Sequence, residues 1–302
     1  MHSKQTFMKI RILIQLLIIV TILQSCKSSS TVSQISEESE IAFKAGDYNK
    51  ALAICEKEIS DKETKGKSAI GPVYVGAGKA ALELNQLDKA RKYLETARSM
   101  SYSSPDMYES LAKVYKNIDN LSKEITALEN YRKFYPQGEK TNTITIRLFE
   151  TYVESENWDL ANKLWPEIES QAQSEVNLLA GYLVVNKKLE NTAGCDKIAQ
   201  QILKLDGSNV TSLEWYAEKY YWKAENLYLS EMKAYKAKRT NSQYSRLLKA
   251  LEQVYPDFRK SRDYYLKLYK IDPKKEYANY LGNIFTRLDD KEKAEYYYKK
   301  AK

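Results

Sequence analysis

Side chains that commonly catalyse reactions or bind metals are scarce in this sequence. Among its 302 residues the only histidine is His2, within residues 1–25, which we expect to be cleaved off. A chain without histidine has no Ser/His/Asp triad, no Cys/His nucleophile and no histidine metal site. The chain also has no CxxC pair and no calcium-loop spacing. The sequence therefore predicts that the protein is not an enzyme and that it binds no metal and no cofactor.

Residues 71–80 match a phosphate-binding loop only in part. The first glycine of that motif falls on Val73, and the residue after the lysine is Ala80 instead of Ser or Thr. We therefore expect Gly78 to permit close helix packing and not to bind phosphate. The 40 Asp and Glu residues are too numerous for any pair to indicate acid–base catalysis without a pocket. A two-carboxylate hydrolase, similar to a muramidase, stays open as a third hypothesis.

The remaining candidates are surface residues, and a repeated pattern positions them. Small and larger apolar residues recur at five fixed offsets along the chain. Residues three or four positions apart lie on one helix face, and the longer step between two such groups crosses a short turn. The pattern occurs at these residues: Gly78, Ala81, Ala90, Leu94 and Ala97; Ala112, Tyr115, Glu124, Leu128 and Tyr131; Phe149, Tyr152, Ala161, Trp165 and Ile168; Gly282, Phe285, Ala294, Tyr298 and Ala301. A period in the thirties predicts stacked helical hairpins.

These offsets resemble the tetratricopeptide repeat (TPR), with residues 281–301 as the best match. Residues 134–136 and 271–273 are similar to the closing turn of the family, and Gly46-Asp47-Tyr48 to its internal turn. The resemblance implies an all-α fold, a right-handed α-solenoid of antiparallel helix hairpins with about seven units over residues 37–302. Glu124 stands where the family has a small or apolar residue, so we expect weaker packing there. Pro166 should kink the second helix of its unit or delay its start.

One hairpin is expected to be longer than the others, near residues 208–255. This segment contains no Gly and no Pro, and Ala217, Tyr221, Ala224, Tyr228 and Tyr235 form a coiled-coil-like seam. We expect one helix over residues 213–238, a turn near 239–242 and a return along 243–255. Cys195 and Ser261 occupy the same position in their units but are two periods apart. We therefore expect one degenerate unit, this long hairpin, to lie between their two units. The alternative is a normal unit with a poor signature.

The N-terminus resembles that of a bacterial, Bacteroidetes-like TPR lipoprotein. Basic residues precede an apolar run over 12–23 that is too short for a membrane span, and Leu23 to Cys26 resembles a lipobox. The resemblance implies a signal peptide over 1–25 and acyl chains, including palmitate, on Cys26, followed by a flexible tether over 26–36. The acidic cluster that directs some such lipoproteins to the cell surface is missing. We therefore expect the periplasmic face of the outer membrane, with the cell surface as the alternative.

Positive charge is concentrated near the C-terminus. The whole chain has a net charge of +8, and residues 230–302 contain 19 basic and 10 acidic side chains. Export argues against a nucleic-acid partner, so acidic proteins or anionic lipid headgroups are the better candidates. A solvated, lysine-rich helical surface is the alternative.

The TPR resemblance implies that the first helices of successive units line a binding groove. Counting from the small residue of each unit, the candidate groove residues are Lys79, Lys113, Lys116, Arg246, Asn279 and Asn283. These side chains could hold carboxylates or backbone amides of a partner, although they are too scattered for the family's chaperone-tail clamp. We also expect one of Trp215 and Trp222 to be exposed and to bind a partner. Cys55 and Cys195 should be free and buried, because they lie several units apart.

Two functions remain open at this stage. The first is a lipid-anchored scaffold that binds other envelope proteins or peptides. The second is an envelope carrier or sensor that binds a peptidoglycan fragment or anionic lipid. The partner and the oligomeric state do not follow from the sequence.

Overall fold

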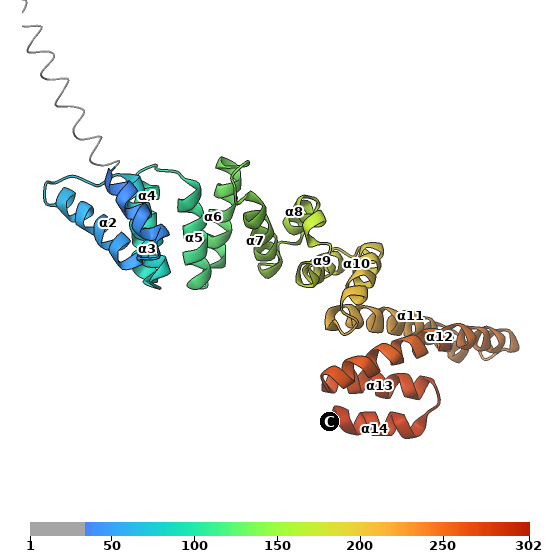
Figure 1. The fold of residues 1–302 in the computed structure, drawn as a ribbon. Helices are drawn as coiled ribbons and strands as arrows, with labels where there is room; N and C mark the ends of the chain where they lie inside the picture. Colours follow the sequence, from blue (N-terminus) through green and yellow to red (C-terminus); the bar gives the residue numbers. More distant parts are fainter. Residues whose placement is uncertain (1–33) are drawn as a thin grey trace, which may run out of the picture. The chain divides into compact units, whose positions relative to one another are not determined.

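The computed structural model describes residues 34–302, and every regular element in that range is an α-helix (Figure 1). The predicted signal peptide, Cys26 and most of the predicted tether lie outside the described residues. Residues 34–36, which we had assigned to the tether, belong to a helix over residues 34–44. Within 34–302 no helix is long and apolar enough to cross a membrane.

Short turns join the helices in pairs, and residues 34–302 contain seven such pairs. The helices after residues 34–44 are α2 (Tyr48–Glu63), α3 (Gly71–Glu83), α4 (Leu87–Ser99), α5 (Pro105–Asn117), α6 (Leu121–Phe134), α7 (Thr141–Glu154), α8 (Trp158–Ala172), α9 (Val176–Lys188), α10 (Thr192–Leu205), α11 (Val210–Ala237), α12 (Asn241–Ile271), α13 (Lys275–Arg287) and α14 (Lys291–Ala301). The chain divides into two compact units between Thr151 and Tyr152. Each unit is described on its own below.

The turns inside the pairs share one backbone solution. In six of them, within the described residues, the residue at the bend has a positive φ angle: Gly46, Asn85, Asp119, Glu156, Glu190 and Asp289. A left-handed residue after the last helical turn is a common helix C-terminal cap. In four of these turns the following residue, Asp47, Asn120, Asn191 or Asp290, caps the second helix by accepting a backbone N–H bond. The short turns predicted between the paired helices are thus confirmed.

The first unit is held together by small residues at the helix crossings. Gly78 of α3 lies so close to α4 that a Cβ atom there would be 2.5 Å from Cγ of Leu94. Ala90 and Leu94 are fully buried at this crossing. One hairpin earlier, the Ser39 hydroxyl donates to the backbone carbonyl of Ala51, twelve residues along the chain. The predicted close-packing role of Gly78 therefore follows from its contacts.

The second unit contains the elongated hairpin, formed by α11 and α12 with 28 and 31 residues. Where its two helices cross, the Ser261 hydroxyl donates a 2.8 Å hydrogen bond to the carbonyl of Ala217. These two residues are 44 positions apart in sequence. The equivalent pair in the preceding hairpin, Leu183 and Cys195, is 12 residues apart. The 32 extra residues lengthen the two helices by roughly 24 Å each at 1.5 Å per residue.

The prediction of a long hairpin is confirmed, but its C-terminal boundary was wrong. We expected the return helix to end at Tyr255 and Ser261 to belong to a further unit. Instead α12 runs on through Pro256 to Ile271, so one hairpin fills the two-period gap. A proline costs an interior helix one hydrogen bond, and burial of the next turn, including Phe258, offsets that cost here. Pro166 likewise lies inside α8, which begins at Trp158 without delay.

Cys55 and Cys195 are both free and buried, which confirms the prediction for these two residues. Cys55 lies against the Ser39 hydroxyl, with 3.0 Å between sulfur and oxygen. Both thiols fill space where helices cross, as small apolar side chains do.

Candidate protein-binding surface

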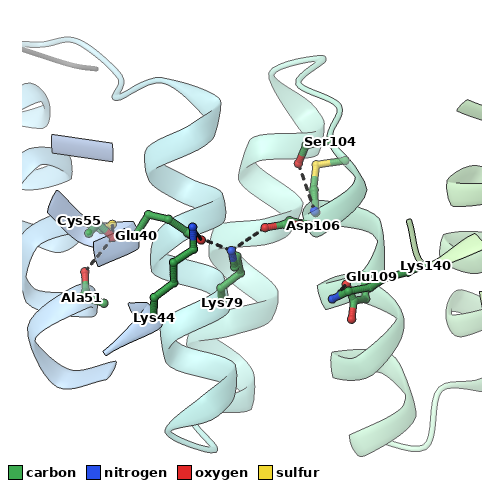
Figure 2. Close-up of polar contacts among 11 residues, drawn as sticks. Glu40, Lys44, Ala51, Cys55, Lys79, Ser104, Asp106, Glu109 and Lys140 are labelled. Atoms are coloured by element: carbon green, nitrogen blue, oxygen red, sulfur yellow. Dashed lines mark hydrogen bonds and ion pairs between the residues drawn. The ribbon is translucent and has the colours of Figure 1, made fainter. Parts of the chain in front are cut away.

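In the first unit, charged side chains connect the first helices of three successive pairs (Figure 2). Lys79 of α3 lies between Glu40 of the 34–44 helix and Asp106 of α5, with its Nζ 3.1 and 2.5 Å from their oxygens. Burial alone would lower the pKa of Lys79, but hydrogen bonds to Asp106 and Glu40 outweigh it and raise the pKa. Lys79 therefore joins helix pairs of this unit, and a ligand would have to displace two carboxylates to bind it.

A second charged group follows on α5. Glu109 accepts from Lys113 at 2.8 Å and from Lys140 at 2.7 Å. Burial alone would raise the pKa of Glu109, but the hydrogen bonds from these two lysines lower it. The carboxylate is thus ionised and orients Lys113 along the helix.

Glu124 of α6, where we expected weakened packing, is buried in a bidentate ion pair. Its two oxygens accept from Nε and Nη2 of Arg147 at 2.7 and 3.1 Å, and Glu150 also contacts that guanidinium, 3.0 Å away. A buried carboxylate needs such a partner because desolvation is costly. The expectation was incomplete, because the arginine that satisfies Glu124 comes from α7.

These side chains surround a pocket of about 360 Å³ between α5, α6 and α7. Its apolar lining consists of these residues: Ala112, Leu128, Ile144 and Ile146. Lys113, Lys116 and Arg147 contribute positive charge, and Glu109, Glu124 and Glu150 negative charge. The volume is at the lower end of the range for ligand sites, roughly 300–1,000 Å³, which suits one or two side chains of a peptide.

Lys116 differs from the other cations of this pocket. Lys113 is paired with Glu109 and Arg147 with Glu124. Lys116 is exposed, and its ammonium group makes no ion pair or hydrogen bond among residues 34–302. Its ammonium group can therefore bind a carboxylate from outside the chain without breaking an existing contact.

The remaining predicted site residues lie in the second unit and do not form one surface. The amide oxygen of Asn283 accepts from the Tyr298 hydroxyl at 2.8 Å, whereas Asn279 is exposed. Arg246 lies on α12, the second helix of its pair, and pairs with Glu231 at 2.9 Å. The expectation that Arg246 lines the surface of the first helices was therefore wrong, because the register of the elongated hairpin differs from a normal unit.

The two tryptophans have different environments. Trp215 donates through Nε1 to Asp196 at 3.0 Å, and Lys219 pairs with the same carboxylate. Burial alone would raise the pKa of Asp196, but the bonds from Lys219 and Trp215 lower it. Trp222 is 47% exposed. The predicted exposure of one tryptophan is thus found at Trp222, and its predicted binding role stays a prediction.

Sequence reasoning missed Arg147, Ile144 and Ile146, which form the α7 side of the pocket. Their side chains meet α5 only after α7 packs in the unit. Glu124 was the available signal, because a carboxylate at a position that is normally small must find a cation nearby if it is buried.

Comparisons with known proteins agree with this architecture. A tetratricopeptide repeat family model matches residues 75–139. The C-terminal part of a TPR repeat-containing protein from Cytophaga hutchinsonii is similar over 88% of this chain and 93% of its own, with a TM-score of 0.52 and 16% identity. A putative protein binding protein from Bacteroides ovatus covers 62% of this chain and 99% of its own, with a TM-score of 0.49 and 17% identity. No curated protein matches the sequence.

A third solved structure, that of YrrB, a TPR protein with an unusual peptide-binding site, covers 58% of this chain and 87% of its own, with a TM-score of 0.48 and 13% identity. At such identities structural similarity shows the fold alone. The predicted fold class, an all-α TPR-like arrangement of helix hairpins, is confirmed. Residues 75–139 are identified as tetratricopeptide repeats.

Proposed function

We propose that the protein is a non-catalytic scaffold that binds a peptide segment of another protein in the pocket between α5, α6 and α7. The observation that carries the proposal is the partnerless Lys116 beside an apolar lining whose other charges are paired. A bound segment would place an apolar side chain in the pocket and a carboxylate on Lys116. Such a combination gives both orientation and affinity.

We further propose that the scaffold acts in a bacterial envelope and is held there by lipid on Cys26. The support is the sequence pattern of residues 1–26, a basic start and an apolar run that ends in a lipobox-like tetrapeptide. Two or more acyl chains give a stable anchor. The partner would then be another envelope protein, met at the periplasmic face of the outer membrane.

The pocket can be tested by photo-crosslinking in cells of the source organism. A photoreactive amino acid replaces Thr143, an exposed residue of the pocket wall. We expect a discrete protein adduct, identified by mass spectrometry. Lys116→Glu should reduce the adduct about tenfold, because an attractive contact becomes repulsive.

The matched control is Lys57→Glu, the same change at an exposed residue of α2 outside the pocket. This variant should leave the adduct yield unchanged. Equal loss in both variants, or no loss in either, would exclude the pocket as the binding site. Recovery of only glycan or lipid would favour the carrier or sensor function instead.

A further inference from the structure

The outer half of the elongated hairpin carries an excess of positive charge. Residues 226–252 contain six exposed basic side chains: Lys233, Lys236, Lys238, Arg239, Arg246 and Lys249. Only two acidic residues lie in this segment, Glu231 and Glu252. Glu231 is already neutralised by Arg246. The outer half therefore has a net charge of +4.

Large apolar side chains are exposed on the same outer half. Leu229 of α11 is 48% exposed, and Tyr244 and Leu248 of α12 are 49% and 44% exposed. On α11, Leu229 lies seven residues after Trp222 and seven before Lys236, so these three side chains share one helix face. On α12, Tyr244, Leu248 and Leu251 are spaced by four and three residues and also share a face.

Nearer the base of the hairpin, α13 and α14 pack against the corresponding face of α12, and α13 contacts α11 beside the face of Trp222, which is itself 47% exposed. Glu225, four residues before Leu229, is held by Arg287 at the end of α13. That guanidinium also lies over the ring of Tyr228, 4.3 Å from its centroid. On α12 the same face continues by helical spacing to Tyr269, which packs edge-on against Tyr297 of α14.

The last pair of helices is too short to cover the whole hairpin. α13 ends at the level of Glu225, and beyond that level Leu229, Tyr244 and Leu248 are 44–49% exposed. We call these partly exposed faces the ledge: Leu229, Met232 and Lys236 of α11 with Tyr244, Leu248 and Leu251 of α12. On α12 the ledge thus continues a face that packs against α13 and α14 elsewhere in the same unit.

We propose that the ledge binds an acidic amphipathic α-helix of a partner protein. The shape favours a helix, because the same face of α12 packs against the helices α13 and α14 further along. The charge favours an acidic partner, whose leucine-like face would cover Leu229, Tyr244 and Leu248 while its carboxylates meet Lys233 and Lys236. This site is separate from the pocket between α5, α6 and α7 and does not depend on it.

An anionic membrane surface is the less favoured occupant. A hairpin that enters a bilayer tip first must bury its tip, where charged side chains are costly. Here the tip, residues 237–240, contains Lys238 and Arg239 and no large apolar residue. The exposed apolar side chains lie along the flank, from Tyr244 in the first turn of α12 to Leu229 and Leu248 nearer the base.

The test uses the full chain with Cys26→Ser, so that no acyl anchor contributes. The probe is a 15-residue peptide stapled as a helix, with leucines on one face and glutamates at its borders, labelled for fluorescence anisotropy. A second peptide carries lysines in place of the glutamates. At about 0.15 M salt, where the Debye length is about 8 Å, we expect the acidic peptide to bind at least about tenfold more tightly than the basic one.

Two double variants of the ledge should each weaken binding of the acidic peptide by about tenfold or more. Lys233→Glu/Lys236→Glu acts by reversing the charge, and Leu229→Ser/Leu248→Ser acts by removing apolar contact. The matched control is Lys260→Glu/Lys267→Glu, the same charge change on another face of α12, where Lys260 lies over the ring of Tyr220. The control should bind as the parent does. Circular dichroism of each variant verifies that the helices are retained.

Three results would overturn the proposal. Equal binding of both peptides would remove the charge argument, and equal affinity of ledge and control variants would place the site elsewhere. The third is that the protein sediments with vesicles of phosphatidylcholine and phosphatidylglycerol, that the ledge variants no longer do so, and that the acidic peptide does not bind. That combination would assign the ledge to a membrane.

Discussion

The two buried cysteines are chemically quiet because of where they lie. Burial, followed by the nearby charge of Asp196, raises the pKa of Cys195 to about 11. Burial also raises the pKa of Cys55, although its hydrogen bond with Ser39 acts in the opposite direction. The thiolate is the reactive form, so both side chains are mostly unreactive thiols at neutral pH.

We predict that iodoacetamide at pH 8 does not modify Cys55 or Cys195 in the folded protein. After unfolding in guanidinium chloride both should react at the rate of ordinary cysteines, because their pKa returns toward 9.0. Mass spectrometry of peptides from timed reactions measures both rates. Rapid labelling of the folded protein would show that one of the two helix crossings opens frequently.

Buried glutamates are the second feature decided by single residues. Glu225 is buried and receives two bonds from Arg287, whose side chain is mostly covered as well. Glu124 and Arg147 form the comparable pair in the first unit. Removing one partner from such a pair leaves a charge in a poorly solvated place.

Arg287→Ala should therefore lower the free energy of unfolding by about 3–5 kcal/mol. Urea unfolding followed by circular dichroism gives this value. The control is Lys299→Ala, which breaks the exposed pair between Lys299 and Glu295 and should have no measurable effect. A small loss for Arg287→Ala would mean that water reaches Glu225 freely.

At the scale of elements, the bends inside the helix pairs use left-handed residues that are not always glycine. Glu190 has a φ of 56°, and its side chain is exposed. Gly46 occupies the same place in the first pair with a φ of 78°, and nothing lies within 4 Å of the position a Cβ would take there. Non-glycine residues are strained in this conformation.

Glu190→Gly should stabilise the protein by about 0.5–1 kcal/mol, since glycine adopts a positive φ without steric cost. Gly46→Ala should destabilise it by a similar amount for the same reason. Thermal unfolding of both variants against the parent tests the pair. Destabilisation by Glu190→Gly would indicate that the glutamate side chain, and not the backbone angle, stabilises this turn.

The elongated hairpin shows how far patterns along one element can be extended. The apolar seam from Ala217 to Tyr235 predicted α11 well, because the absence of Gly and Pro and a helical period are local signals. The end of α12 was missed, because Pro256 is a local signal for a break that packing of Phe258 and Ser261 overrides.

At the scale of the whole molecule, the proposed anchor determines where both binding surfaces would act. We predict that Cys26→Ala prevents attachment of palmitate, because the acylated thiol is lost. Metabolic labelling with an alkyne-bearing palmitate, followed by membrane fractionation, measures this. Ser25→Ala keeps a small residue beside the cysteine and should retain the label. Labelled Cys26→Ala protein would disprove lipidation at this residue.

The sequence by itself determined the helix pairs, their turns, the extra length of α11 and the buried state of both cysteines. These features depend on residues a few positions or one hairpin apart, so their spacing is visible in the chain. Part of the candidate site was visible in the same way, since Lys113 and Lys116 were predicted for the surface that carries the pocket. Only the tertiary structure decided that Lys79 forms ion pairs with Glu40 and Asp106 and that Arg147 forms one with Glu124. It also decided that Leu229 and Leu248 stay exposed beyond the end of α13. Each of these depends on which side chains from different helix pairs meet, and packing in three dimensions sets those contacts.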